Sequence, residues 1–166
     1  GVADVYCTEI DQDRFPWIEK FGGTPIDGRE QEDPVAQILD RHRLGVDAVL
    51  EVAGAKEVVP QGLKMIRNGG FYGLVGLVHP DSALTVEAEM IIRKCLTLQG
   101  VHNYAPSHLD EAIAFLSRSA DVLPFGDLVS PPVPLAQLED GVELAKSQRW
   151  LRVSISMEDG SATLPT

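Results

Sequence analysis

Two stretches decide the fold of this chain: GVDAVLEVAG at residues 45–54 and GGFYGLVGL at residues 69–77. Each contains an apolar run of strand length that leads into glycine, and a helix-length segment joins the two. A third apolar run ends at Glu9. Strands that alternate with helices at this spacing form parallel sheets with right-handed crossovers. The pattern therefore predicts an α/β fold with a doubly wound, Rossmann-like parallel sheet.

The position of Glu9 indicates that this sheet is incomplete at its N-terminal side. In doubly wound dinucleotide-binding folds, an acidic residue at the end of the second strand binds the ribose, about 20 residues after a G-x-G-x-x-G turn that holds the pyrophosphate. Only eight residues precede Glu9. We expect the first strand, the glycine-rich loop and the first helix to be absent. Because the first strand lies between the second and the fourth, two edges of the sheet should be unpaired and the segment alone poorly stable.

Composition excludes several classes of function. The chain has 166 residues, of which 44% are hydrophobic, and its formal net charge is -11. Such a charge argues against nucleic acid or an anionic membrane surface as partner, because both require clustered positive charge. No apolar run reaches the roughly 18 residues of a membrane span. A cytoplasmic protein is expected, with Cys7 and Cys95 as buried, reduced thiols and no disulfide.

The remaining segments continue the alternation of helix and strand. We expect helices over residues 11–21, 35–44, 55–67, 87–94, 109–118 and 135–146, and further strands over residues 24–26, 96–101 and 150–157. Pro60 should make the 55–67 helix start late, and Asn68-Gly69-Gly70 should stop it. The strand over residues 47–52 should be covered on both faces, because it is nearly all apolar. We assign residues 1–125 to a partial dinucleotide-binding domain, 126–157 to a return toward a catalytic domain, and 158–166 to a tail.

Four phrases in this order resemble the medium-chain dehydrogenase/reductase family, and within it the zinc-type alcohol dehydrogenases. They are GVDAVLEVAG at residues 45–54, GGFYGLVGL at 69–77, LQG at 98–100, and WLRV at 150–153 after a Pro-Leu helix. The resemblance covers nearly the whole chain. GVHNY at residues 100–104, with the helix that follows, resembles the branch associated with phosphonate catabolism.

The resemblance implies a chemistry for the parent protein. This family transfers hydride between an alcohol or carbonyl and a nicotinamide, while a zinc ion polarises the oxygen as Lewis acid. In the family the zinc ligands belong to an N-terminal domain, so zinc is expected in the parent and not in this chain. We therefore expect a fragment of an NAD-dependent zinc-type alcohol dehydrogenase that is inactive alone and provides no catalytic residue.

The resemblance also implies which residues contact the cofactor. Glu9 matches the ribose-binding acid and favours NAD, since a carboxylate repels the 2′-phosphate of NADP. Arg14 matches a basic position near that ribose or is a surface arginine. The positions implied to line the nicotinamide side or contact the cofactor are Val52, Ala53, Gly54, Val75, Gly76, Leu77, Val101 and His102. Arg152 matches an arginine that reaches the pyrophosphate or is a strand-edge charge.

The histidines and Glu51 do not indicate a further functional site. The histidines at positions 42, 79, 102 and 108 show no spacing typical of a metal site. Glu51 lies in an apolar strand, so its carboxylate should have hydrogen-bond partners or lie at the strand end. That role is structural first.

Two further interpretations remain open at the level of sequence. The first is the cofactor domain of a zinc-free quinone or enoyl reductase, which usually prefers NADPH. The second is a non-catalytic dimerisation module, because the strand near residues 96–101 would leave an uncovered edge that could extend the sheet into a second copy. A homo-oligomer formed through this edge is therefore the expected assembly.

Overall fold

The computed structural model describes residues 2–157, which fall into two compact units divided between Leu109 and Asp110. The expected tail over residues 158–166 lies outside the described residues. The assignment of residues 126–157 as a return toward a catalytic domain stays a prediction. Each unit is described separately below.

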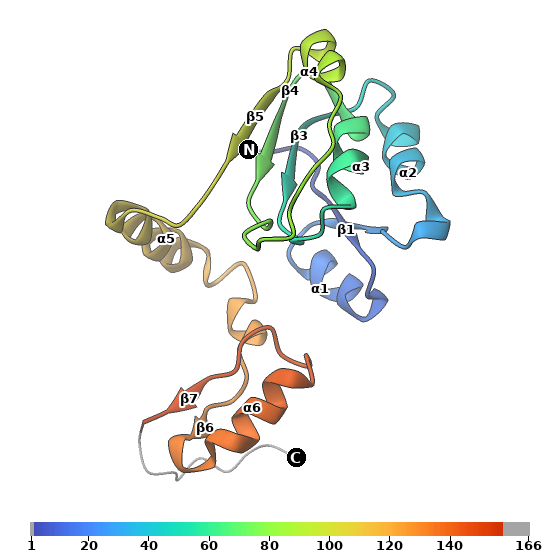
Figure 1. The fold of residues 1–166 in the computed structure, drawn as a ribbon. Helices are drawn as coiled ribbons and strands as arrows, with labels where there is room; N and C mark the ends of the chain where they lie inside the picture. The colour runs from blue at the N-terminus through green and yellow to red at the C-terminus, as the bar shows by residue number, and fades with distance from the viewer. Residues whose placement is uncertain (1, 158–166) are drawn as a thin grey trace. The chain divides into compact units, whose positions relative to one another are not determined.

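The first unit contains two separate parallel sheets (Figure 1). Strand β1 (Tyr6–Glu9) pairs with β2 (Thr24–Asp27), while β3 (Val46–Glu51), β4 (Ile66–Leu74) and β5 (Thr97–Gly100) form the second sheet in that order. Within residues 2–157, β1 and β3 belong to different sheets. The doubly wound α/β fold is confirmed, and so is the break between β1 and β3 expected from the position of Glu9.

Two helices of the first unit start at a side-chain cap, η1 (Gln12–Arg14) at Asp11 and α2 (Pro34–Arg41) at Asp33. The other helices of the first unit are α1 (Phe15–Lys20), η2 (Glu30–Glu32), α3 (Val58–Met65) and α4 (Ala88–Lys94), and α5 (Pro106–Ser119) crosses the division between the two units. Asp33 accepts a hydrogen bond from the Ala36 amide, and Pro34 occupies the first turn of α2. Helix α3 starts late, as expected, which places Pro60 in its first turn.

Two clusters of buried side chains form the core of this unit. Val59, Leu63, Ile66 and Tyr72 pack between α3 and β4. Ile26, Ile38 and Met65 form the second cluster, with one residue each from β2, α2 and α3. Helices α2 and α3 contact each other beside the strands (Figure 1). The two sheets are thus joined through packed helices rather than through strand pairing.

Strand β4 differs from its expected bounds at both ends. It begins at Ile66 directly after α3, so Asn68-Gly69-Gly70 does not stop the helix but lies within the strand. Ile66 pairs with Val46, and the next pair is Ala48 with Phe71, so β4 contains three more residues than β3 over this interval. The irregularity accommodates Gly69 at a φ of 71°. At its other end β4 stops at Leu74, so residues 75–77 form a loop with a bend at Gly76.

One face of the three-stranded sheet is open, contrary to the expectation that residues 47–52 are covered on both faces. The exposed fraction of Leu50 is 63%, whereas Glu51 is 2% exposed. The side chains of successive strand residues point to opposite faces, and β3 packs against α3 through the face that carries Val49. Leu50 therefore points away from the covered face.

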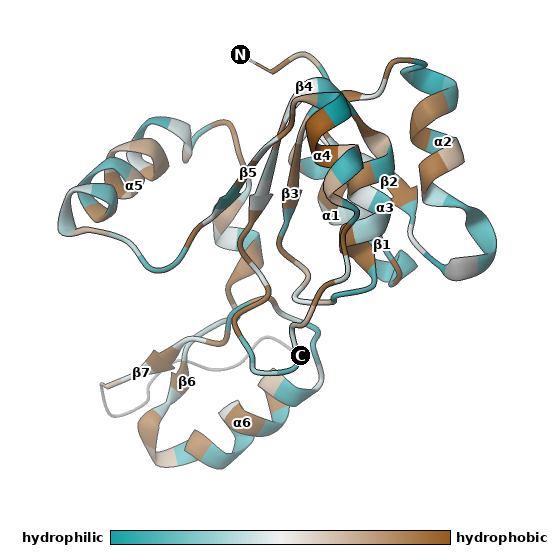
Figure 2. Cartoon of the chain, turned by 45° about the horizontal axis from the view of Figure 1, so that its top comes forward, coloured by the Kyte–Doolittle hydropathy of each residue, from teal (hydrophilic) through white to brown (hydrophobic). Residues whose placement is uncertain are grey.

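Helix α5 has the expected apolar spacing but none of its residues is buried. Leu109, Ile113 and Leu116 are 48%, 54% and 45% exposed. Figure 2 shows hydrophobic and hydrophilic residues side by side along this helix. The amphipathic pattern was read correctly from the sequence, but no contact within the described residues buries it.

The second unit is small, and besides the part of α5 after Leu109 its described residues form short elements around α6 (Leu138–Lys146). These elements are η3 (Phe125–Leu128), β6 (Val133–Pro134), η4 (Leu135–Gln137) and β7 (Ile155–Ser156). Strands β6 and β7 are parallel, and a Cβ on Gly141 of α6 would lie 2.8 Å from Ile155 Cδ1. The strand expected over residues 150–157 is shorter than expected because β6 offers only two residues for pairing. Arg152 adds one isolated bridge to Val129.

The thiols of Cys7 and Cys95 differ in their exposure to solvent. Cys7 is half-buried, and this burial, with the Glu9 charge as second cause, raises its pKa. Cys95 is exposed, so the expectation that it is buried was wrong. It follows α4 with a φ of 51°, a left-handed conformation that ends the helix and leaves its side chain outside the packed face. Both cysteines are free.

Candidate functional site at the carboxyl ends of the strands

Glu9 ends β1, with its carboxylate held by its own neighbours. The Oε1 atom accepts hydrogen bonds from the backbone amides of Ile10 at 2.8 Å and Asp11 at 3.0 Å. The Oε2 atom lies 3.6 Å from Nη1 of Arg14, whose Nε lies 3.5 Å from Asp11. Glu9 and Arg14 are therefore brought together in a partly exposed cluster, and their contacts with the ribose stay predictions.

A second carboxylate, which sequence reasoning missed, lies beside Glu9. Asp27 ends β2 and pairs in register with Glu9. It accepts hydrogen bonds from Arg29 Nε at 2.9 Å and from Gln12 Nε2 at 2.9 Å. The bonds to Arg29 hold the pKa of Asp27 well below its ordinary value, at about 2. The signal that could have revealed it was the position of an acid at the end of a short strand.

Glu51 ends β3 and connects two loops. Its Oε1 atom accepts a hydrogen bond from the Gly54 amide at 2.6 Å, and its Oε2 atom accepts one from the Gly76 amide at 3.1 Å. Its backbone carbonyl also accepts from the amides of Val75 at 2.9 Å and Gly76 at 3.0 Å. The side chain is buried, so the expectations of hydrogen-bond partners and of a strand-end position are both confirmed.

The two loops approach each other closely. A Cβ on Gly76 would lie 2.5 Å from the Gly54 nitrogen and 2.7 Å from the Val52 carbonyl carbon, which leaves no room for any side chain. Gly54 itself has a φ of 73°. Residues 52–54 and 75–77 thus form one continuous backbone surface at the carboxyl ends of β3 and β4, and the sequence-predicted positions in both loops meet there.

Two side-chain contacts join the residues that follow β3 to the residues that follow β4. His79 Nε2 lies 2.8 Å from the Gly54 carbonyl oxygen, and Lys56 Nζ lies 3.1 Å from Asp81. Sequence reasoning assigned neither contact, since the partners are 25 residues apart in the chain.

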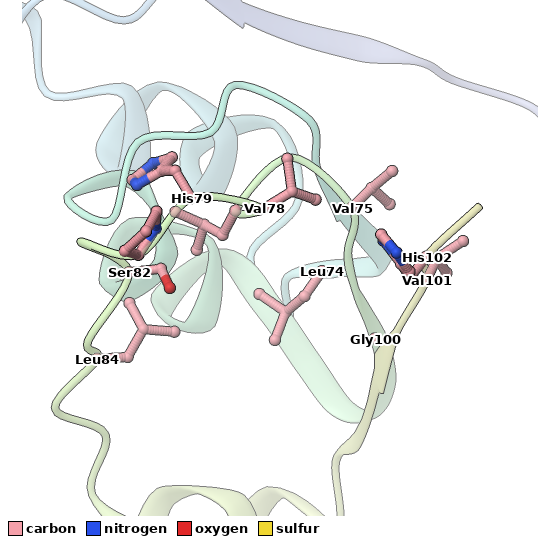
Figure 3. A pocket seen from close by; sticks show the side chains of 11 residues that line it. Leu74, Val75, Val78, His79, Ser82, Leu84, Gly100, Val101 and His102 are labelled. Atoms are coloured by element: carbon pink, nitrogen blue, oxygen red, sulfur yellow. The ribbon is translucent and has the colours of Figure 1, made fainter.

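A cavity of about 800 Å³ opens beside this loop surface (Figure 3). Its lining includes Val75, Leu77, Val101 and His102. Figure 3 places Val75, Val101 and His102 around the ends of β4 and β5. The Val101 amide donates to the Leu74 carbonyl at 2.9 Å, which continues the pairing of β5 with β4. Open α/β sheets bind ligands outside the carboxyl ends of their strands, and this cavity lies at such an end.

Arg152 is the one predicted site residue outside the first unit. Its backbone amide donates to the Leu128 carbonyl, and its Nη1 donates to the Leu151 carbonyl at 2.7 Å. Its proposed contact with the pyrophosphate stays a prediction.

The described residues supply no cluster of three or more histidine, cysteine, aspartate or glutamate side chains that could hold a metal ion. Among the same residues, no helix is both long and apolar enough to cross a membrane.

The family model and the curated relatives that match this chain all describe dehydrogenases. Residues 1–118 match the family described as "Zinc-binding dehydrogenase". The chain is 29% identical over 148 residues to L-threonine 3-dehydrogenase of Symbiobacterium thermophilum, covering 89% of this chain and 42% of that protein. It is 27% identical over 139 residues to D-altritol 5-dehydrogenase of Agrobacterium fabrum, covering 83% of this chain and 38% of that protein.

Solved structures agree on the fold. A (2R,3R)-butanediol dehydrogenase from Bacillus subtilis superposes with a TM-score of 0.78 at 26% identity, covering 94% of this chain and 45% of that one. An alcohol dehydrogenase from Thermotoga maritima gives a TM-score of 0.81 at 23% identity, covering 94% of this chain and 44% of that one. The chain thus spans less than half the length of the dehydrogenases it matches. It belongs to the zinc-binding dehydrogenase family, as the four phrases of its sequence predict.

Proposed function

We propose that this chain forms the cofactor-binding part of an NAD-dependent zinc-type alcohol dehydrogenase, which transfers hydride between a small alcohol or carbonyl compound and nicotinamide. The observation that carries the proposal is the meeting of residues 52–54 and 75–77 at the carboxyl ends of β3 and β4, beside the 800 Å³ cavity. Such strand ends are where doubly wound folds bind dinucleotides. The zinc ion of the parent protein would polarise the substrate oxygen, with ligands from outside this chain.

Charge at the ends of β1 and β2 supports NAD rather than NADP. Glu9 and Asp27 lie side by side, and both arginines nearby are already paired with carboxylates: Arg14 with Glu9 and Asp11, and Arg29 with Asp27. A 2′-phosphate placed here would meet two carboxylates beside two arginines that already bind carboxylates. Ribose hydroxyls, in contrast, can donate to a carboxylate oxygen.

The other cofactor contacts follow from the same arrangement. Residues 52–54, 75–77 and the pair Val101 and His102 would face the nicotinamide side, while Arg14 would lie near the adenosine ribose. His102 Nε2 accepts a hydrogen bond from Asn103 Nδ2 at 3.0 Å, which orients its ring, and no acid or base role is proposed for it. No residue of this chain is proposed to be catalytic.

The test is a titration of the ¹⁵N-labelled chain with NAD⁺ and with NADP⁺. Without a glycine-rich phosphate loop, binding should be weak, with a Kd on the order of 1 mM. We expect NAD⁺ to shift the amide signals of Glu9, Gly54 and Gly76, and NADP⁺ to shift that of Glu9 less. A preference for NADP⁺ would favour the quinone or enoyl reductase alternative, and no shift with either would refute cofactor binding by this chain.

We also propose that β5 forms an oligomer contact. Strand β5 is bonded to β4 on one edge, and all four of its residues are exposed. A strand edge with free backbone groups pairs readily with a second copy. Sedimentation that shows monomer only, at high protein concentration, would refute this contact. Two free cysteines agree with a cytoplasmic location, where thiols stay reduced.

A further inference from the structure

We infer that Glu51 is a positioning residue: its buried carboxylate clamps residues 52–54 to residues 75–77 and so fixes the loops proposed to face the nicotinamide. The cofactor part of this inference rests on the proposed function above. The clamp itself rests only on the geometry around Glu51.

Glu51 connects two loops that are distant in sequence. Gly54 lies three residues after Glu51 and Gly76 lies 25 residues after it, yet each backbone amide donates to a different oxygen of the same carboxylate, at 2.6 Å and 3.1 Å. Both donors belong to the backbone, so neither can turn away by changing a rotamer. The carboxylate therefore holds the Gly54 amide, and it holds the Gly76 amide together with the Glu51 backbone carbonyl, which accepts from the same nitrogen at 3.0 Å.

Because Glu51 is buried, its hydrogen bonds favour one conformation of the two loops over others. The exposed fraction of Glu51 is 2%, so water offers little replacement for a lost protein donor. A buried carboxylate that loses a donor carries a large desolvation cost. The loops are consequently favoured in the one conformation that satisfies both oxygens.

The close approach at Gly76 shows that the two loops have room for the Glu51 carboxylate only because this residue has no side chain. A Cβ on Gly76 would lie 3.0 Å from Glu51 Oε1 and 2.5 Å from the Gly54 nitrogen. Only a residue without a side chain lets the second loop come close enough for the carboxylate to reach both amides. His79 then holds the carbonyl of Gly54 at 2.8 Å, which fixes the other side of the same peptide segment.

A glutamine at this position tests the clamp. Glu51→Gln keeps the shape but replaces one acceptor oxygen with an NH₂ group, which would face one of the two amide donors. Asp47→Asn is the matched control: it makes the same chemical change on the same strand, where the carboxylate is 86% exposed and bound to Arg67. Amide hydrogen exchange of the 166-residue chain is measured by NMR for both variants.

We expect Glu51→Gln to speed exchange at Gly54 or Gly76 by at least about tenfold, with the Tyr72 amide unchanged, and Asp47→Asn to change neither loop. Exchange at both glycines equal to the parent chain would overturn the inference. An equal acceleration at Tyr72 would overturn it as well, because Glu51 would then support the whole sheet rather than position loops.

A second measurement needs no variant to fold. Scalar coupling across the hydrogen bonds, between the Gly54 and Gly76 amide nitrogens and the Glu51 carboxyl carbon, is measured in the parent chain. Couplings at both amides support the clamp, and their absence at both overturns it.

The cofactor part is tested separately. With NAD⁺, Glu51→Gln should keep the amide shift at Glu9 and lose most of the shift at Gly54 and Gly76. Retention of the full loop shifts would overturn the positioning role. If NAD⁺ shifts no amide even in the parent chain, the proposed function fails, while hydrogen exchange and coupling still decide the clamp.

Discussion

The two sheets of the first unit are stabilised in different ways. The three-stranded sheet packs Val59, Leu63, Ile66 and Tyr72 into one buried cluster, and the end of its first strand is tied to a distant loop by buried Glu51. The two-stranded sheet buries Ile26, and its carboxyl end is surrounded by partly exposed charges that bond to near neighbours. The comparison teaches that burial is concentrated in the three-stranded sheet, whereas the proposed discrimination between NAD and NADP would depend on exposed charges at the end of the two-stranded sheet.

The largest effect should come from the packed face of the three-stranded sheet. Leu63→Ala removes a side chain that is 2% exposed, so we expect a loss of about 2–5 kcal/mol in the free energy of unfolding. Leu50→Ala on the open face, where the side chain is 63% exposed, should cost less than about 1 kcal/mol. Urea unfolding measures both values. Equal losses would show that the open face is covered in solution.

A smaller effect is expected where the loops meet. Gly76→Ala places a methyl group 2.5 Å from the Gly54 nitrogen, and backbone must move, at a cost of about 1–3 kcal/mol. Gly100→Ala is the control, because a Cβ there meets nothing within 4 Å. Thermal unfolding compares the two. A neutral Gly76→Ala would mean that the loops are further apart than described.

A substitution of Glu9 at the end of β1 should change the cofactor preference and leave the stability nearly unchanged. Glu9→Gln keeps the shape of a partly exposed side chain, so the free energy of unfolding should move by no more than about 0.5 kcal/mol. Removing the negative charge should abolish most of the preference for NAD⁺ over NADP⁺ in the amide titration. An unchanged preference would transfer the discrimination to Asp27.

The smallest effect is the pH dependence contributed by Asp27. Its pKa in the folded chain is about 2, below the ordinary value of 3.8, because Arg29 bonds to the ionised form. The folded state therefore favours the carboxylate, and this contribution is complete above pH 3.8 and is lost as the pH falls toward 2. Asp27→Asn should flatten the acid limb of the stability curve in that interval. A limb identical to that of the parent chain would contradict the ion pair.

Much of the fold was predictable because its signals are local. The caps at Asp11 and Asp33, the late start of α3 and the alternation of strands and helices all follow from neighbouring residues. The bounds of β4 were not predictable, since Ile66 is drawn into the sheet by pairing with Val46, 20 residues earlier. The exposure of Leu50 and Cys95 was missed for a related reason: apolar character does not reveal which face finds a partner.

In the candidate site, too, some residues could be recognised from the sequence and others depend on contacts between distant residues. Glu9 and the glycine turns were recognisable because strand-end acids and glycines recur at known places in doubly wound folds. Asp27 with Arg29, and the contact of His79 with Gly54, left no separate mark in the sequence. The same holds for the contact from Glu51 to Gly76, which exists only once β3 and β4 are paired side by side.

The sequence by itself determined the family, the order of strands and helices, and the break in the sheet next to Glu9. These depend on residue type and spacing along the chain. Only the tertiary structure decided that the buried carboxylate of Glu51 connects two loops, that two arginines near Glu9 are already paired, and that one sheet face stays open. The physical reason is that hydrogen bonds, ion pairs and burial depend on distances between residues far apart in the chain, which spacing alone does not specify.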